Sequence, residues 1–195
     1  MKKYLAEAFG TATLTAIVIL SVSSEYIIAT PLAAGLTLLL FVYTIGSMTG
    51  AQINPAVTLG LMSIKKLPMK DGMMYIIYQI IGAAVALILC SYIDMIPKNI
   101  DPSFSWKILS GEIVGTLFFT FGIASIVYGK VSDTMSGVVI GGSLVMGILF
   151  AAYIGSNGIL NPAVAFGIGS LGWAYVLGPI IGSIAGFNLY KFLRE

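Results

Sequence analysis

Long apolar stretches, separated by short polar segments, run along almost the whole chain. A helix needs about 20 mostly apolar residues to cross the hydrocarbon core of a bilayer. Six stretches approach or reach that length and predict six membrane-spanning helices, over residues 5–22, 31–47, 73–93, 108–128, 136–154 and 173–192. Two shorter apolar stretches, 55–64 and 162–171, are too short to cross and too apolar for aqueous loops. We expect them to form re-entrant half-helices, in an all-α integral membrane fold.

The composition agrees with this pattern. Of the 195 residues, 58% are hydrophobic and 9% are charged, against about 25% charged in a soluble domain. The chain has no histidine and one cysteine, Cys90. These counts exclude a disulfide framework, a zinc site of several thiolates and a Ser-His or Cys-His catalytic arrangement. We therefore expect no enzyme, no cofactor and, since basic clusters are absent from the sequence, no nucleic-acid partner.

The basic residues predict how the chain lies in the membrane. With both termini on the inner side, the inner segments hold eight lysine and arginine residues, and the outer segments hold only Lys98 and Lys107. Basic loops stay on the cytoplasmic side of a membrane, so we expect a multi-pass cell-membrane protein with both termini in the cytoplasm. The first apolar stretch has no obvious small-residue cleavage site and is expected to remain as a membrane helix.

The two halves of the chain carry the same short segments in the same order. Glu7-Ala-Phe-Gly-Thr recurs as Glu112-Ile-Val-Gly-Thr, and Asn54-Pro-Ala-Val recurs as Asn161-Pro-Ala-Val. Because each half contains three spans, the second copy must cross the membrane in the opposite direction. We expect one domain over 1–195, an inverted repeat with copies at about 1–100 and 101–195, and a solute site near the membrane centre.

Each short apolar stretch begins with Asn-Pro, which is a helix start. Proline at the first turn lacks only an N–H that would be unpaired there, and asparagine is a favoured N-cap. In an upside-down pair the two starts meet, and their partial positive charge repels cations and protons. The asparagine NH₂ groups would face a passing solute oxygen. The residues expected to line this pore are Asn54, Pro55, Ala56, Asn161, Pro162 and Ala163.

These motifs resemble those of the aquaporin and glycerol-facilitator family. The segment from Gly50 to Thr58, Gly-Ala-Gln-Ile-Asn-Pro-Ala-Val-Thr, is similar to the family's Gly-Ala-His-x-Asn-Pro-Ala-Val-Thr, with Gln52 in place of histidine. The Glu-x-x-Gly-Thr segments and Gln79-x-x-Gly82 fit as well, and the resemblance covers nearly the whole chain. It implies an hourglass-shaped monomer with its own pore, assembled as a homotetramer in the bilayer. The pore would pass water or small neutral solutes such as glycerol and exclude ions and protons.

The chain departs from the family pattern at the outer selectivity filter. The second family motif normally reads Asn-Pro-Ala-Arg, and this chain has Val164 where the arginine is expected. The segment resembles an atypical branch of the family that also lacks the arginine. The resemblance implies a filter made of Ala34, either Leu149 or Phe150, Gly158 and Val164.

Such a filter carries no fixed positive charge and few hydrogen-bond donors. We expect a wider, more apolar constriction than in a strict water channel, suited to glycerol, urea, ammonia or hydrogen peroxide. The opposite possibility is that the apolar residues close the pore by dewetting.

Two carboxylates inside predicted spans, Glu7 and Glu112, need protein or water around them because charge is unfavourable in lipid. One hypothesis is structural: each accepts hydrogen bonds from the loop ahead of a half-helix, with Gln52 as further polar support. The other is a proton relay in a secondary transporter, a class that also uses inverted repeats. A third interpretation is a non-conducting structural protein with the same fold.

Overall fold

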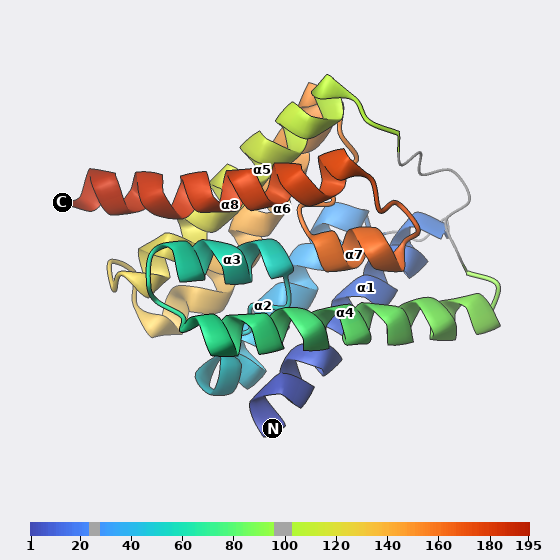
Figure 1. Cartoon of the computed structure of the whole chain (residues 1–195), viewed down its shortest axis with the longest axis horizontal. Helices are drawn as coiled ribbons and strands as arrows, with labels where there is room; N and C mark the ends of the chain where they lie inside the picture. Colours follow the sequence, from blue (N-terminus) through green and yellow to red (C-terminus); the bar gives the residue numbers. More distant parts are fainter. Residues whose placement is uncertain (24–27, 96–102) are drawn as a thin grey trace.

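The computed structural model describes residues 1–23, 28–95 and 103–195, and helices account for most of these ranges (Figure 1). Lys98, which was counted above among the outer basic residues, lies outside the described residues.

Six long helices match the six predicted spans, and each is long and apolar enough to cross a membrane. They are α1 (Lys2–Ser23), α2 (Thr30–Thr49), α4 (Met69–Tyr92), α5 (Trp106–Val127), α6 (Ser136–Ile154) and α8 (Trp173–Arg194). Two short helices, α3 (Pro55–Ser63) and α7 (Pro162–Gly167), match the two short stretches, and a 3₁₀ turn, η1 (Asp133–Met135), precedes α6. The predicted all-α membrane fold is therefore confirmed.

Two boundaries differ from the prediction by four residues, for local reasons, and the others differ by at most three. α4 begins at Met69 instead of residue 73, because its first turn carries the charged residues Lys70 and Asp71, which an apolar pattern excludes. An aspartate in the first turn nevertheless stabilises a helix. α7 ends at Gly167 instead of residue 171, because Gly169 turns the chain with a φ of 74°.

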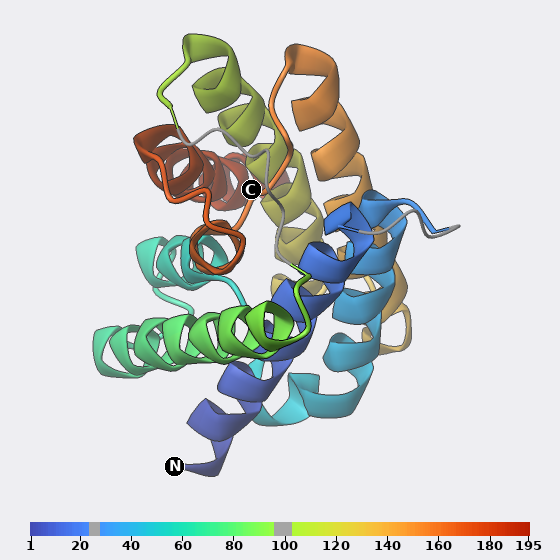
Figure 2. The same ribbon diagram turned by 90° about the vertical axis from the view of Figure 1, so that its right-hand side faces the viewer.

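The long helices form two bundles that the short helices connect. Figure 2 shows α1, α2 and α4 on one side of the molecule and α5, α6 and α8 on the other. α2 packs against α6 across the boundary, α3 packs against α8, and α7 packs against α4. Each short helix therefore reaches a long helix of the opposite bundle. In Figure 1, α3 and α7 lie end to end between α8 and α4, with their starts toward each other.

A glycine allows the closest approach of helices in each bundle. A Cβ atom at Gly82 of α4 would lie 2.2 Å from the carbonyl oxygen of Ala8 in α1, and one at Gly182 of α8 would lie 2.3 Å from that of Ile113 in α5. Both distances are far below van der Waals contact. Small residues are what membrane helices need to pack this closely, so both positions require glycine.

The distribution of polar and apolar side chains is inverted relative to a soluble protein. Large apolar side chains such as Leu40, Ile88 and Phe192 are exposed on the outside, whereas Glu7 and Glu112 are fully buried. An apolar exterior around polar interior groups is the arrangement expected where lipid is the solvent.

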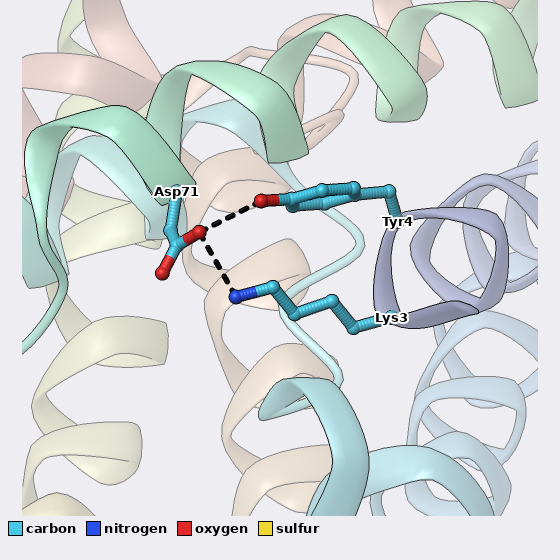
Figure 3. Close-up of polar contacts among 3 residues, drawn as sticks. All are labelled: Lys3, Tyr4 and Asp71. Atoms are coloured by element: carbon cyan, nitrogen blue, oxygen red, sulfur yellow. Dashed lines mark hydrogen bonds and ion pairs between the residues drawn. The ribbon is translucent and has the colours of Figure 1, made fainter. Parts of the chain in front are cut away.

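A polar cluster joins the beginnings of α1 and α4 (Figure 3). Lys3 Nζ lies 2.9 Å from Asp71 Oδ1, and the Tyr4 hydroxyl donates a hydrogen bond of 2.7 Å to the same oxygen. The Tyr4 ring stacks on Tyr78, with 5.5 Å between the centroids. The lysine and the aspartate remain partly exposed, and an exposed ion pair contributes little to stability because water screens it.

Candidate functional site

The site is centred where the starts of α3 and α7 meet. Asn54 caps α3 through its Oδ1, which accepts a hydrogen bond from the Ala56 amide at 2.8 Å. Asn161 caps α7 in the same way, accepting from Ala163 at 3.0 Å and from Val164 at 3.4 Å. The prolines that follow provide the first helical residue without adding an unpaired donor.

The two asparagines also connect the half-helices to each other. Asn54 Nδ2 donates to the carbonyl oxygen of Leu160 at 2.9 Å, and Asn161 Nδ2 donates to that of Ile53 at 3.0 Å. Each NH₂ group therefore uses one N–H across the meeting point. An amide nitrogen has two hydrogens, so each asparagine retains at most one donor for a solute, fewer than the sequence suggested.

Two buried carboxylates hold the loops that lead into the half-helices. Glu7 accepts from the amides of Gln52 (3.0 Å) and Ile53 (2.7 Å), and Glu112 accepts from those of Ile159 (3.0 Å) and Leu160 (2.7 Å). Each carboxylate thus has the loop amides as partners, which is the arrangement of the structural hypothesis.

These loops need such support because their backbone is strained. Ile53 has a φ of 38° and Leu160 a φ of 54°, in the left-handed region that bulky side chains rarely adopt. A residue held in such a conformation raises the energy of the folded state by about 1–3 kcal/mol, so the surroundings must stabilise it. The carboxylates supply that stabilisation, and the strained residues present their carbonyl oxygens to the asparagines.

A chain of polar side chains supports the first loop further. Gln79 Nε2 donates to Glu7 at 2.8 Å and to the Thr58 hydroxyl at 3.1 Å, and that hydroxyl lies 2.7 Å from the Gln52 carbonyl oxygen. All four side chains are at least 95% buried, with Gln52 the most exposed at 5%. The contacts orient Gln52 by holding its side-chain oxygen. In the sequence, Thr58 and Gln79 stand out only as parts of the motifs, although a glutamine inside an apolar span is itself a sign of a polar contact in the interior.

A cavity of about 240 Å³, which we name the α7 cavity, lies beside Asn54 and Asn161. None of the described residues that line it is charged. The polar side chains along its wall are those of Thr30, Gln52, Asn54, Asn157 and Asn161. The remaining wall is mostly aliphatic, so the cavity suits a neutral molecule.

The α7 cavity contains three of the predicted filter residues, Ala34, Gly158 and Val164. It does not contain Leu149 or Phe150. Leu149 is 37% exposed on the outside, and Phe150 stacks there on Phe118.

Ile148 takes the expected place in the α7 cavity and is 7% exposed. The prediction for α6 was therefore wrong by a rotation about the helix axis, because consecutive residues of a helix point about 100° apart. The proline and alanine residues predicted to line the pore do not line the α7 cavity either. They are buried in the half-helix packing and are Pro55, Ala56, Pro162 and Ala163.

A second cavity, of about 460 Å³, lies beside α3 and is named the α3 cavity. Val57 and Leu61 of α3 line it, together with residues of α2, α5 and α6. Leu38, Gln52 and Phe119 line both cavities. The two cavities and these shared residues outline one path past the meeting point of the half-helices.

The described residues contain no group of three histidine, cysteine, aspartate or glutamate side chains placed to hold a metal ion. The chemistry that the site offers is hydrogen bonding from the asparagines, Gln52 and the loop carbonyls, next to an apolar wall. Such a surface can guide a small polar molecule.

Comparison with known proteins relates this chain to a described family. The family described as major intrinsic protein matches residues 1–190. A probable glycerol uptake facilitator protein from Thermotoga maritima is 32% identical over 236 residues, covering 99% of this chain and all of the relative. Aquaporin AqpM from Methanothermobacter marburgensis is 32% identical over 195 residues, covering 86% of this chain and 77% of the relative.

The fold also matches a solved structure. The X-ray structure of the aquaglyceroporin from Plasmodium falciparum superimposes with a TM-score of 0.76 at 20% identity, covering 97% of this chain and 95% of that one. At this identity the likeness concerns the fold alone.

Proposed function

The chain belongs to the major intrinsic protein family, the family of aquaporins and glycerol facilitators, and we propose that it is a passive channel for water and small neutral solutes such as glycerol. The observation that carries the proposal is the α7 cavity, which combines the two half-helix starts with a wall that bears no charge. Relatives named as an aquaporin and as a glycerol uptake facilitator support the same solute range.

The two helix starts account for the exclusion of ions. Their partial positive charges converge beside Asn54 and Asn161 and oppose the entry of cations and protons. The remaining N–H of each asparagine donates to the oxygen of a passing water or alcohol. A water oriented in this way turns its own hydrogens outward, which interrupts a hydrogen-bonded chain along which protons would move.

Val164 sets the breadth of the solute range in this proposal. A valine in place of the family's arginine leaves neither a fixed charge nor a donor at that position, and Ala34, Ile148 and Gly158 complete a mostly apolar ring. A carbon-bearing solute such as glycerol can contact these side chains while its hydroxyl groups bond the loop carbonyls and the asparagines.

Reconstitution in liposomes tests the function. Stopped-flow light scattering measures shrinkage against an impermeant osmolyte and re-swelling in glycerol. We expect fast shrinkage followed by rapid glycerol re-swelling. Fast shrinkage alone would show a water-selective channel, and rates equal to those of empty liposomes would support a closed or structural protein.

The filter is tested by two substitutions at one position. Val164→Arg adds length, charge and donors, and should reduce glycerol flux more than water flux. Val164→Leu adds apolar volume without charge and is the matched control. Unchanged glycerol flux in Val164→Arg would remove Val164 from the filter.

A secondary transporter is the alternative from another class. It requires a coupling-ion site, and Glu7 and Glu112 are the intramembrane acidic candidates. Each already accepts three hydrogen bonds, including one from the Gln79 side chain and one from Ser156 respectively. Uptake that saturates and depends on an ion gradient would favour the transporter.

We further propose that the chain forms one channel domain of two inverted copies, and that it is not an enzyme. In this proposal the protein lies in the cell membrane with both termini in the cytoplasm. It assembles as a homotetramer. The excess of basic residues in the inner segments supports the orientation. Accessibility of a tag at each terminus in intact cells tests the orientation, and cross-linking in the membrane tests the tetramer.

A further inference from the structure

The path past the asparagines consists of two cavities that share three lining residues. The α7 cavity contains Asn54 and Asn161, whereas the α3 cavity contains neither. The residues common to both cavities are Leu38 from α2, Gln52 from the loop before α3, and Phe119 from α5. The boundary between the cavities is therefore displaced from the asparagines toward α3, and side chains from three separate elements form it.

The residues of this boundary are buried and mainly apolar. Leu38 is 2% exposed, Phe119 is 1% exposed and Gln52 is 5% exposed, so a water-sized molecule reaches almost none of their surface. The Gln52 oxygen is held by Thr58, which limits how far this side chain can swing aside. Leu38 and Phe119 present hydrocarbon to the path, and an apolar constriction disfavours the passage of water.

We propose that Phe119, together with Leu38, forms a second constriction, on the α3 side of the asparagine pair, that limits the size of the permeating solute. The proposal rests on the channel function above and adds a selectivity element apart from Val164. Phe119 is the larger of the two side chains, and a solute passes only when its ring moves out of the path. A solute the size of glycerol requires a larger displacement than water does.

The adjacent phenylalanine gives a matched control. Phe118 precedes Phe119 on α5, but it is 44% exposed on the outside and stacks on Phe150, with 4.3 Å between the ring centroids. Phe118→Ala removes the same ring from the same helix without touching either cavity. Because Phe119 belongs to the buried core and Phe118 does not, this control accounts for the loss of a ring from α5, and the stability of each variant is measured separately.

The test compares the full-length wild type, Phe119→Ala and Phe118→Ala in liposomes, with water and glycerol fluxes measured separately. We expect Phe119→Ala to raise glycerol permeability about tenfold, which corresponds to a barrier lower by about 1.4 kcal/mol, and to raise water permeability less. Phe118→Ala should leave both fluxes and their ratio unchanged. Phe119→Trp should lower glycerol flux below that of the wild type.

Size-exclusion profiles and thermal unfolding establish that each variant is folded. If Phe119→Ala does not fold, Phe119→Leu removes part of the ring and should give a smaller rise in the same direction. A wild type that conducts, with Phe119 variants that leave the glycerol-to-water ratio unchanged, overturns the constriction and keeps the channel. An impermeable wild type with a conducting Phe119→Ala supports the constriction, whereas folded variants that all fail to conduct overturn both proposals.

Discussion

The loop before α3 and the loop before α7 place an asparagine at the same point of the fold, but different side chains support them. Both loops bond a buried glutamate, Glu7 or Glu112, through two consecutive amides. Around the first loop the contacts continue through Gln79 and Thr58 to Gln52. Around the second loop the additional bond comes from the Ser156 hydroxyl, at 2.5 Å from Glu112.

The difference shows which contacts each loop requires. Counted from the two asparagines, Ile159 stands where the first loop has Gln52, and Ala165 stands where α3 has Thr58. An isoleucine needs no hydrogen-bond partner, whereas a buried glutamine does. The carboxylate is thus the shared requirement for the strained backbone, and the longer network of the first loop serves to orient one polar side chain toward the path.

The largest expected effect is the loss of a carboxylate. Glu112→Ala leaves the amides of Ile159 and Leu160 without an acceptor, and each buried unpaired N–H destabilises by about 1–3 kcal/mol. We expect Glu7→Ala to be milder, because the Gln79 amide, 2.8 Å from Glu7, can turn its oxygen to the loop. Thermal unfolding in detergent measures both. Equal losses of stability in the two alanine variants would remove the distinction between the two loops. Glu112→Gln keeps one acceptor oxygen, and its unfolding temperature should lie between those of the wild type and Glu112→Ala.

The next largest effect, the loss of stability when a glycine between two packed helices is replaced, should be the same in both bundles. Gly82→Ala and Gly182→Ala each place a methyl group against a backbone carbonyl of the neighbouring helix, and overpacking of this kind destabilises by about 1–3 kcal/mol. The control is Gly142→Ala on α6, where an added Cβ meets nothing within 4 Å. Unfolding temperatures measure all three. A clear difference between Gly82→Ala and Gly182→Ala would show that the two bundles tolerate separation unequally.

A smaller loss of stability, from removing one hydroxyl of the hydrogen-bond network, should be limited to the loop before α3. Thr58→Val keeps the shape of the side chain but removes the hydroxyl that joins Gln52 to Gln79, and we expect a loss of about 1–2 kcal/mol with altered water flux. Thr37→Val removes a hydroxyl that bonds only its own helix, at Ala33, and should be nearly neutral. Matching values for the two variants would show that the network does not stabilise the fold.

The smallest effect concerns the cluster of Figure 3. Lys3→Gln removes the ion pair between α1 and α4, whose partners are 37% and 29% exposed, and should change the unfolding temperature only slightly, because water and salt screen an exposed pair. In the described part of the chain, no ion pair joins the corresponding helices α5 and α8. Unfolding at low and high salt tests this. A large loss that salt does not reproduce would mean that Lys3 acts through packing against Tyr4.

The fold was predictable because run length and helix starts are explicit in the sequence. In lipid, six long apolar runs have few alternatives to spanning helices, and two Asn-Pro starts fixed where α3 and α7 begin. The C-terminal end of α7 was less certain, since Gly167 and Gly169 both permit a turn and only the packed structure selects one of them. The glutamates were identifiable because a buried charge inside a span requires partners.

The pore wall was only partly predictable. In a soluble protein, polarity separates the outer face of a helix from the inner face, but a membrane helix is apolar on both. Phe118 and Phe119 are the same residue type, yet Phe118 is exposed on the outside and Phe119 lines the path. The rotation of α6, which selects Ile148 over Leu149, is set by packing against its neighbours.

Each asparagine donates a hydrogen bond to the loop of the other half of the chain, and these bonds have a consequence for how the protein inserts into the membrane. Asn54 reaches its acceptor on Leu160 only after the ribosome has released a further hundred or so residues, because the two positions are 106 apart in the chain. Until then the first half can enter the bilayer, but its half-helix start lacks its partner. We therefore expect the re-entrant α3 to be the last part of the first half to settle.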